Sequence, residues 1–256
     1  MTDLSNSSYI VTGASRGFGL AITHALLGSG ANVGMVARND ESLQHVVAEL
    51  DTERVIGLAA DVSDEEQVNS AFARIKAHFD GLNGLVNNAG LARPSSIEHL
   101  NHEEVMLQVM TNYLGTVYCS QAVIPLLRGE NNPRIINISS ASARHFDEMS
   151  HLSIYASTKA AVERFSRDLA FELKPDGIGV TCIRPGAADT SFAEGWDFDK
   201  LAAGVDAWQR TGPHMNAGMA VEDVANAVVH CLAYPQHVAV DLLEVRPKQL
   251  SDKLKL

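Results

Sequence analysis

The chain has 256 residues, of which 46% are hydrophobic and 20% are charged, as expected of a soluble globular protein with a sizeable core. Its formal net charge of −11 argues against a nucleic-acid or anionic-membrane partner, because both are bound by clustered Lys and Arg side chains. The three cysteines lie far apart without a Cys-x-x-Cys pair, so neither a disulfide framework nor a cysteine zinc site is indicated.

The first residues are not expected to form a signal peptide. They show no basic segment followed by an apolar one, which a secretory signal needs. No apolar run approaches the roughly 20 residues that cross a bilayer. We therefore expect a protein of the reducing cytoplasm.

Short apolar runs alternate with helix-like segments along the chain. The runs that predict strands are 8–12, 32–37, 54–60, 82–86, 134–139, 178–183 and 242–245. The segments that predict helices are 20–27, 41–50, 63–79, 102–127, 153–173 and 221–232. Ser63 and Glu66 fit a capping box at the start of the third helix. This alternation, with continuously apolar strands, predicts one doubly wound α/β domain over 1–256, with a parallel sheet covered on both faces.

Residues 190–216 show no clear period of either kind. They contain four aromatic residues, Phe192, Trp196, Phe198 and Trp208. A stretch of this length is long enough to be a mobile lid over a substrate site. The aromatic residues are equally compatible with ordinary core or with a subunit interface, so 190–216 is treated as a candidate lid.

Three glycines, Gly13, Gly17 and Gly19, join the first predicted strand to the first predicted helix. Glycine permits a tight turn and a close backbone approach, and the N-terminus of a helix offers free N–H groups to a phosphate. The strand–turn–helix context favours dinucleotide binding over a purely structural turn. The spacing is Thr-Gly-x-x-x-Gly-x-Gly, which differs from the Gly-x-Gly-x-x-Gly fingerprint.

The helix predicted over 153–173 carries Tyr155 and Lys159 near its start, four residues apart and therefore on one face. An apolar stripe is predicted to continue along this helix through Ala161, Phe165, Leu169 and Leu173. A phenol has a pKa of about 10, and a neighbouring ammonium lowers it by favouring the phenolate. Such a pair suits a general acid or base acting on a hydroxyl or carbonyl substrate. By itself, the spacing also fits a surface Tyr beside a solvated Lys.

Six motifs occur in a set order along the chain. They are Thr12-Gly13-Ala14-Ser15-Arg16-Gly17-Phe18-Gly19, Asn87-Asn88-Ala89-Gly90, Asn112, Asn137-Ile138-Ser139-Ser140, Tyr155-x-x-x-Lys159 and Pro185-Gly186. In this order and spacing the chain resembles the short-chain dehydrogenase/reductase family, in its compact branch of about this length. The resemblance covers roughly residues 7–247 and implies a seven-stranded Rossmann fold.

The resemblance implies a set of catalytic residues. Tyr155 would be the acid/base, and Lys159 would lower its pKa while binding the nicotinamide ribose. Ser140 would hold the substrate oxygen, with Ser139 as the alternative. Asn112 lies inside an otherwise apolar helix, where Asn is disfavoured, and would hold a water that relays protons to the Lys. The alternative for Asn112 is a side chain that faces the solvent. The alternative for the serine is a hydroxyl at the strand end that is bonded to the backbone.

The resemblance also implies a set of cofactor-binding residues. These are Gly13, Ser15, Arg16, Gly17, Phe18, Gly19, Arg38, Asp61, Val62, Asn88, Ala89, Gly90, Tyr155, Lys159, Pro185, Gly186 and Thr190. Asn88 would also brace the central strands. Asp61 and Val62 would take the adenine, although Asp61 could instead cap the next helix. The nicotinamide would lie alongside Pro185, Gly186 and Thr190.

The end of the second predicted strand indicates which nicotinamide cofactor is used. An acidic residue there would bind the ribose hydroxyls and repel a 2′-phosphate, but this chain has Ala37 followed by Arg38. Arg16 stands in the glycine-rich loop. Two guanidinium groups without a carboxylate favour a phosphate, although both could be solvated surface arginines. The prediction is NADP(H), with NAD(H) as the weaker alternative.

The predicted function is an NADP(H)-dependent oxidoreductase that interconverts a ketone or aldehyde and an alcohol by hydride transfer. Two alternatives stay open: a catalytically silent NADP(H)-binding redox sensor or scaffold, and an epimerase or dehydratase of the same family. The resemblance implies a dimer or tetramer formed through helices 102–127 and 153–173, although their apolar stripes could equally face the sheet. No metal site is predicted, because His99 and His102 lack a third ligand.

Overall fold

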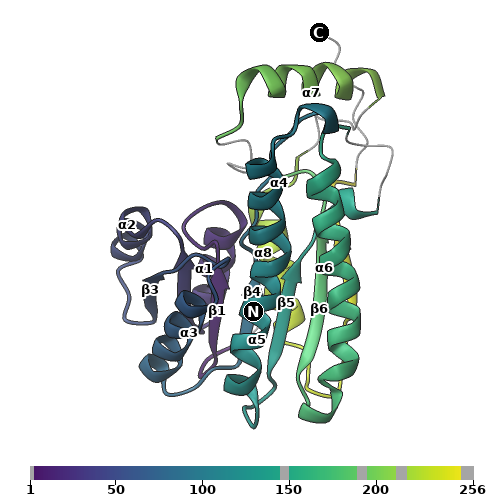
Figure 1. The fold of residues 1–256 in the computed structure, drawn as a ribbon. Coiled ribbons are helices and arrows are strands. Elements are labelled where there is room, and N and C mark those ends of the chain that lie inside the picture. The colour runs from purple at the N-terminus through teal and green to yellow at the C-terminus, as the bar shows by residue number, and fades with distance from the viewer. Residues whose placement is uncertain (1–2, 145–149, 189–194, 212–217, 249–256) are drawn as a thin grey trace.

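Seven parallel strands form one sheet in the computed structural model, in the order β3-β2-β1-β4-β5-β6-β7 (Figure 1). The strands are β1 Ser8–Thr12, β2 Asn32–Ala37, β3 Val55–Ala59, β4 Gly84–Asn87, β5 Arg134–Ile138, β6 Gly179–Pro185 and β7 Leu242–Val245. The structure describes residues 3–144, 150–188, 195–211 and 218–248.

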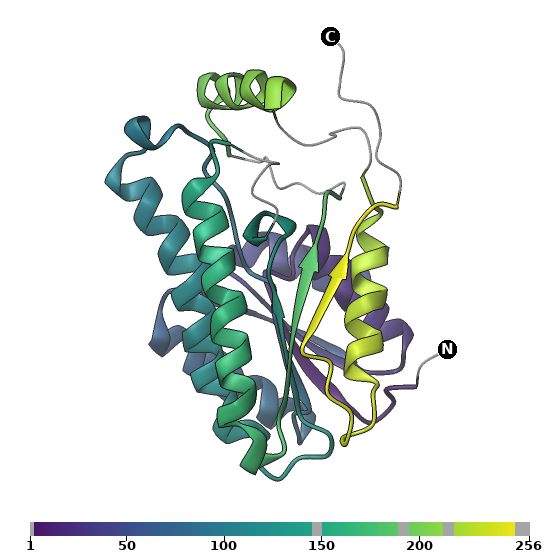
Figure 2. The same cartoon turned by 90° about the vertical axis from the view of Figure 1, so that its right-hand side faces the viewer.

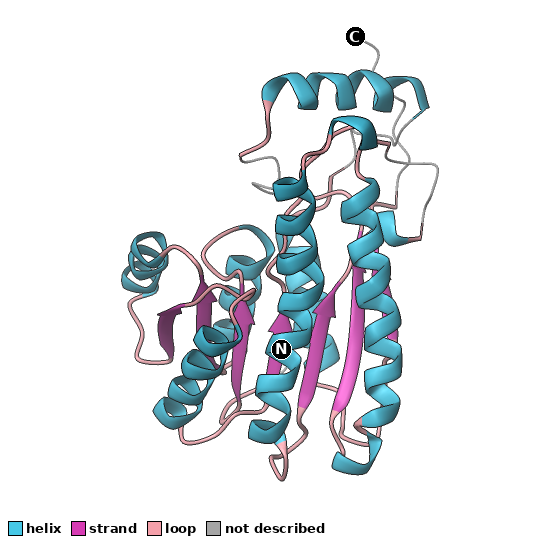
Figure 3. Ribbon diagram, viewed as in Figure 1, coloured by secondary structure: helices cyan, strands magenta, loops and turns pink. Residues whose placement is uncertain are grey.

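Helices connect the strands and cover both faces of the sheet. The α-helices are α1 Gly17–Gly28, α2 Asp40–Leu50, α3 Glu65–Phe79, α4 His102–Val109, α5 Gly115–Leu127, α6 Ser153–Glu172, α7 Phe198–Thr211 and α8 Val221–Leu232. Shorter helical turns are η1 Ile97–His99, η2 Met110–Leu114, η3 Ala141–Ala143 and η4 Lys174–Asp176. Figure 3 shows the strands lying between layers of helices, which confirms the predicted doubly wound α/β fold.

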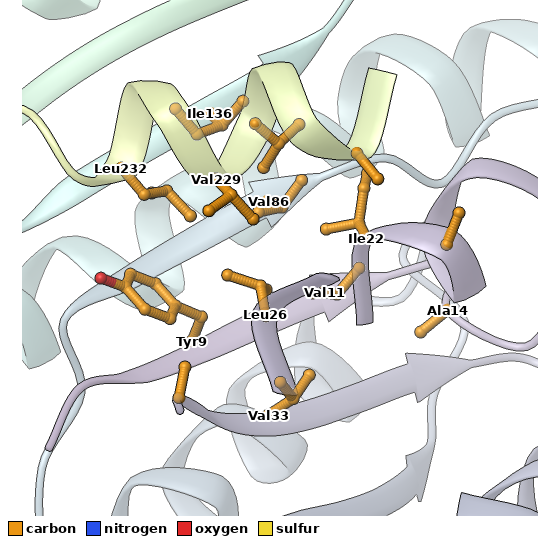
Figure 4. Packing of buried hydrophobic residues seen from close by; sticks show 14 of the residues in the cluster. Tyr9, Val11, Ala14, Ile22, Leu26, Val33, Val86, Ile136, Val229 and Leu232 are labelled. Carbon is orange, nitrogen blue, oxygen red and sulfur yellow. The ribbon is translucent and has the colours of Figure 1, made fainter. Parts of the chain in front are cut away.

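Each face of the sheet has its own apolar core. On one face, Ile22 and Leu26 of α1 meet Val229 of α8 above Val11 of β1 and Val86 of β4 (Figure 4). All five are at most 7% exposed. Figure 2 shows α8 on the opposite side of the sheet from the long α4–α5 and α6 helices.

The other core lies under the helices that were candidates for subunit contacts. It includes Phe72 of α3, Val123 of α5 and Leu169 of α6. The apolar stripes of α5 and α6 therefore face the sheet. Oligomerisation through these helices stays a prediction. No helix among the described residues is both long and apolar enough to cross a membrane.

The strand order reverses beside β1, which lies between β2 and β4. The chain runs outward in one direction from β1 to β3 and in the other from β4 to β7. In a doubly wound sheet this reversal opens a crevice at the carboxyl ends of the strands. The predicted site motifs follow β1, β4, β5 and β6 at that edge.

Helix α3 begins differently from the predicted capping box of Ser63 and Glu66. Its N-cap is Asp64, whose carboxylate accepts from the backbone N–H groups of Glu66 and Gln67 at 3.0 and 3.1 Å. The prediction was wrong by one residue, because a carboxylate is a good cap and is favoured by the positive helix end. Ser63 instead donates its hydroxyl to Asp61 at 2.6 Å.

The long helix predicted over 102–127 consists of three helical segments. Helix α4 starts with a capping box of Asn101 and Glu104, and α5 ends at Leu127. Between them, η2 is a π-helical turn that contains Asn112. Such turns are rare in α-helices and occur frequently at functional sites, which is one reason to examine Asn112 closely.

Residues 198–211 form helix α7, which corrects the expectation that 190–216 has no period. Leu201, Val205 and Trp208 recur at intervals of four and three and belong to a small apolar cluster with Tyr155. Figure 1 shows α7 lying across the carboxyl ends of the strands. Residues 190–194 and 212–216 of the candidate lid lie outside the described residues.

Candidate active site

The glycine-rich loop links the carboxyl end of β1 to the start of α1. Gly13 and Gly17 have φ values of 64° and 53°, in the left-handed region that glycine adopts without strain. A Cβ on Gly19 would lie 2.1 Å from the carbonyl oxygen of Gly13, so a side chain has no room there. The first N–H groups of α1 have no partner within the helix. This arrangement suits a bound phosphate.

Asn88, directly after β4, braces this loop. Its amide donates to the carbonyl oxygens of Thr12 and Gly13 at 2.9 and 3.2 Å. The Thr12 hydroxyl in turn accepts from the backbone N–H groups of Asn88 and Ala89, both at 3.1 Å. These bonds join the carboxyl ends of β1 and β4 at the point where the strand order reverses.

Tyr155 and Lys159 lie on the buried face of α6 and are 8% and 4% exposed. The buried residues of this helix are Tyr155, Thr158, Lys159, Val162, Ser166 and Leu169. Ala161 and Phe165, which belong to the predicted apolar stripe, are only partly buried. The apolar stripe gives only part of the buried face, because three buried positions carry the polar side chains of Thr158, Lys159 and Ser166. Neither residue of the Tyr–Lys pair is on the surface.

The ammonium of Lys159 is held beside the ring of Tyr155. Its Nζ donates to the carbonyl oxygen of Ile138 at 2.8 Å and lies 5.9 Å from the ring centroid. A Cβ on Gly90 would lie 3.2 Å from this Nζ, so the segment after β4 passes directly over Lys159. Helix α6, the end of β5 and the segment after β4 therefore meet at this ammonium.

Burial favours the neutral form of both groups. It raises the pKa of Tyr155 to about 12, and a hydrogen bond with Ser140 opposes this effect. It lowers the pKa of Lys159 to about 8. That Lys159 lowers the pKa of this phenol stays a prediction, because the net shift in the protein by itself is upward and its largest cause is desolvation. At neutral pH the Tyr155 phenol is protonated and can donate a proton.

The two serines after β5 point to different partners. Ser140 hydrogen-bonds with Tyr155 and accepts from the Ser142 hydroxyl at 3.0 Å. The Ser139 hydroxyl is 2.8 Å from Oε1 of Glu163 and 3.2 Å from the carbonyl oxygen of Lys159. The geometry thus places Ser140, and not Ser139, beside the phenol.

Asn112 is fully buried and joins η2 to the segment after β4. Its Oδ1 accepts from the Leu91 N–H at 2.8 Å, and its Nδ2 donates to the Leu91 carbonyl oxygen at 2.9 Å. The same Nδ2 donates to the Thr158 hydroxyl at 3.1 Å. The solvent-facing alternative is therefore wrong. Both amide protons are used within the protein, and only Oδ1 can accept a further bond.

Arg38 and Arg16 lie at neighbouring strand ends. The Ala14 N–H donates to the Val36 carbonyl oxygen at 3.2 Å, so the glycine-rich loop adjoins the end of β2. Arg16 is the exposed N-cap residue of α1. The Arg38 Nη1 lies 3.9 Å from Oδ2 of Asp61, which corrects the prediction that no carboxylate is near. At 67% and 30% side-chain exposure, this is a weak pair.

Asp61 closes the turn before α3. Its Oδ1 accepts from the backbone N–H and the hydroxyl of Ser63 at 2.9 and 2.6 Å. It is therefore not the helix cap, which is Asp64. The neighbouring Val62 is buried and packs closely on Gly115 of α5, where an added Cβ would lie 2.7 Å from its Cγ2.

The last predicted cofactor residues follow β6. Pro185 is the final residue of β6, and the Gly186 N–H donates to the Val245 carbonyl oxygen of β7 at 2.8 Å. Thr190 lies outside the described residues. The other predicted site residues all stand at the carboxyl edge of the sheet, on the segments after β1 to β6 or on η2 and α6.

A buried polar network between β4 and β5 was missed by the sequence analysis. The Asn87 Nδ2 donates to Oδ1 of Asn137 at 2.9 Å and to the Ser120 hydroxyl at 3.2 Å. The Asn137 Nδ2 donates to the Ser166 hydroxyl at 2.8 Å. Asn in a central strand was the available signal, since β-strands are depleted in this residue. The network fixes α5 and α6 against the strands that carry the site.

The described residues hold no group of three or more His, Cys, Asp or Glu side chains suited to a metal ion. His99, considered above as a ligand, has its Nδ1 2.7 Å from the Ser96 hydroxyl.

Comparisons with known proteins give a consistent family. Residues 8–200 match the sequence model of a family described as short chain dehydrogenase. An uncharacterized oxidoreductase of Staphylococcus aureus strain USA300 is 32% identical over 247 residues, which cover 96% of this chain and 100% of the relative.

Two solved structures illustrate the similarity of fold. A short chain dehydrogenase from Burkholderia cenocepacia in complex with NADP is 30% identical, with a TM-score of 0.82 over 95% of this chain and 97% of that one. A 3-ketoacyl-(acyl-carrier-protein) reductase from Brucella melitensis complexed with NADH is 26% identical, with a TM-score of 0.82 over 95% and 98%.

Proposed function

Because this chain belongs to the short-chain dehydrogenase family, we propose that it is an NADP(H)-dependent oxidoreductase that interconverts a ketone or aldehyde and an alcohol. The observation that carries the proposal is the cluster of Tyr155, Ser140 and Lys159 at the carboxyl edge of the sheet. There a protonated phenol shares a hydrogen bond with Ser140 and lies beside a buried ammonium. The cluster and the glycine-rich loop lie at the same edge of the sheet.

In the reducing direction, Tyr155 gives its proton to the substrate oxygen while Ser140 donates a hydrogen bond to that oxygen. When bound, NADPH would supply the hydride for the carbonyl carbon. The phenolate left on Tyr155 is stabilised by the Lys159 ammonium, whose position is fixed by its bond to Ile138. Asn112 holds the segment over Lys159 through Leu91, and its Oδ1 can accept a bond from a relay water.

The proposal of NADP(H) over NAD(H) rests on Arg38 and Arg16. Relatives are known with either cofactor, so the choice depends on this chain's own residues. A 2′-phosphate carries more charge than the Asp61 carboxylate and can accept paired bonds from a guanidinium. The weak contact between Arg38 and Asp61 would then be replaced by a stronger one.

Cofactor titration tests this proposal. The fluorescence of the purified protein is followed with NADPH and with NADH, and the better ligand is then used with a panel of ketones and aldehydes. We expect NADPH to bind at least 10-fold more tightly, and Arg38→Glu to remove most of that preference by repelling the phosphate. Equal or better turnover with NADH at matched concentrations would contradict the cofactor assignment. Arg164→Glu, an exposed arginine on the outer side of α6, is the control.

The two serines provide a matched pair of variants. Ser140→Ala is expected to reduce kcat by about 10²-fold, because it removes a donor to the substrate oxygen. Ser139→Ala keeps that donor and should reduce kcat much less, with a lower Tm from the lost bond to Glu163. Steady-state kinetics and thermal melts separate the two. The assignment fails if Ser139→Ala abolishes turnover and Ser140→Ala does not.

We infer that α7, which lies within the candidate lid 190–216, covers the substrate. Two contacts attach its described residues to the body of the protein through Lys200 and Trp208. The Lys200 Nζ binds Oε1 and Oε2 of Glu104 on α4 at 2.8 and 2.7 Å, and the Trp208 Nε1 donates to the Ser150 carbonyl oxygen at 2.6 Å. The ring of Trp208 also belongs to the apolar cluster that contains Tyr155. A homo-oligomeric state and a cytoplasmic location stay predictions from the sequence.

A further inference from the structure

A chain of ion pairs joins α6, β6 and β7 next to the candidate site. Arg184 on β6 is 7% exposed and forms two bonds with Glu163 on α6, from Nε to Oε1 at 2.7 Å and from Nη2 to Oε2 at 2.6 Å. Its Nη1 donates to Oε2 of Glu244 on β7 at 2.7 Å. Arg246 then pairs with Oε1 of Glu244. The four charges sum to zero, and they connect α6 with two neighbouring strands.

A third strand joins the chain of ion pairs through Ser139. Its hydroxyl is 2.8 Å from the same Glu163 oxygen that binds Arg184, and 3.2 Å from the Lys159 carbonyl oxygen. Glu163 therefore holds the carboxyl ends of β5 and β6 to one point of α6. That point is one helical turn beyond Lys159.

Two residues of this network are adjacent in the sequence to proposed site residues. Ser139 precedes Ser140, and Arg184 precedes Pro185 and Gly186. Arg246 also packs on the same loop, since a Cβ on Gly186 would lie 3.0 Å from its Cγ. Displacement of Ser139 or Arg184 would therefore move a residue that the proposed function places at the substrate oxygen or the nicotinamide.

Stability alone is a poor explanation for such a network. The side chains of Arg184, Glu163 and Glu244 are only 9%, 19% and 23% exposed. Replacing a buried ion pair by apolar residues of similar volume is often neutral or stabilising, whereas removing one partner leaves an uncompensated charge. What the two-pronged contact does provide is a set geometry, because a guanidinium binds a carboxylate in one plane.

We propose that Glu163 and Arg184 are positioning residues, which set the catalytic face of α6 against the ends of β5 and β6 and so align Ser140, Lys159 and the nicotinamide end of the cofactor. The proposal rests on the proposed function, because that function places the nicotinamide at Pro185 and Gly186. Neither Glu163 nor Arg184 takes part in the chemical step. Their effect passes through the residues next to them.

The decisive variant is the double substitution Glu163→Met with Arg184→Met. It removes both charges and leaves the Glu244–Arg246 pair in place. Two ligands are titrated: NADPH, and adenosine 2′,5′-bisphosphate, which carries the 2′-phosphate but no nicotinamide. We expect the double variant to bind NADPH at least 10-fold more weakly and the bisphosphate as the wild type does. Its kcat on an accepted carbonyl substrate should fall at least as much as its NADPH affinity.

The matched control is Lys76→Met with Glu130→Met, which removes a partly buried pair at the opposite edge of the sheet, 2.8 Å between Nζ and Oε1. It should leave both affinities unchanged. Arg184→Lys keeps the charge and loses the two-pronged contact, so it gives the same selective loss if the double variant does not fold.

The outcomes separate the two proposals. If the wild type binds neither ligand, the proposed function falls. If the wild type binds both ligands, and both Arg184→Lys and the double variant bind NADPH as tightly as the wild type does, the positioning role is refuted. An equal loss of affinity for both ligands also refutes it, because that result indicates general damage to the fold.

Discussion

Replacing Tyr155 with Phe is expected to lower kcat by about 10³-fold, within the range that a positioned acid or base contributes. The substitution removes one hydroxyl from a ring that is 8% exposed, and the packing against Leu152 and Trp208 is kept. NADPH affinity should therefore stay within about twofold of the wild type, since cofactor binding relies mainly on the glycine-rich loop. Ligand titration and steady-state turnover, measured on the same preparation, give both values.

Tyr9→Phe is the control for this variant. Tyr9 is also buried, at 3% exposure, and lies in the apolar core near the amino end of β1, whereas the site is at the carboxyl end. Removal of the Tyr9 hydroxyl in this variant should leave kcat unchanged. Turnover by Tyr155→Phe close to that of the wild type would remove Tyr155 from the mechanism, whatever the cofactor titration shows.

Replacing Lys159 with Met is expected to abolish most turnover and, at neutral pH, to stabilise the fold. Turnover falls because the phenolate formed at Tyr155 loses the ammonium beside it. Stability rises because burial of this ammonium is costly. Its pKa falls from 10.5 to about 8 on folding, which corresponds to about 3 kcal/mol. The lost bond to Ile138 offsets about 1 kcal/mol of that gain.

The sign of the pH dependence follows from the same pKa. Below pH 8 the ammonium is charged in both states, and the folded protein carries the full cost of burying it. Between pH 8 and 10.5 the unfolded chain binds more protons at this position, so the stability of the wild type rises with pH. The stabilisation by Lys159→Met should therefore be largest below pH 8 and shrink toward pH 10.5. Denaturant unfolding at pH 7, 8.5 and 10 measures it, and a gain that grew with pH would contradict the buried ammonium.

Much of the fold could be predicted from the sequence because the strands of a parallel sheet are buried on both faces. Such strands appear as short apolar runs between helical segments, as in 32–37 and 134–139. The site loops could be predicted because their backbone conformation requires glycine at some positions and the Asn88 side chain at another. There is no room for a Cβ at Gly19, and the Asn88 amide donates a hydrogen bond to the Thr12 carbonyl oxygen that no apolar side chain could make.

Other features depend on contacts that a one-dimensional pattern does not contain. The buried face of α6 includes the polar residues Thr158, Lys159 and Ser166, so a search for apolar periodicity found only part of it. Helix α7 was missed although Leu201, Val205 and Trp208 have helical spacing, because the flanking aromatic residues obscured the period. The Glu163–Arg184 pair joins positions 21 residues apart on different elements. The pKa of Tyr155 depends on burial, which the Tyr–Lys spacing cannot show.

Hydride transfer to a carbonyl substrate is the central claim, and an isotope label tests it most directly. The protein is incubated with NADPH in which both hydrogens at C4 of the nicotinamide are replaced by deuterium and with a panel of ketones and aldehydes, and the products are analysed by mass spectrometry. The account predicts an alcohol that carries one deuterium on the former carbonyl carbon, formed by the wild type and almost absent with Tyr155→Phe. NADPH binding without deuterium in any product, across a panel of small, aromatic and charged carbonyl compounds, would contradict it.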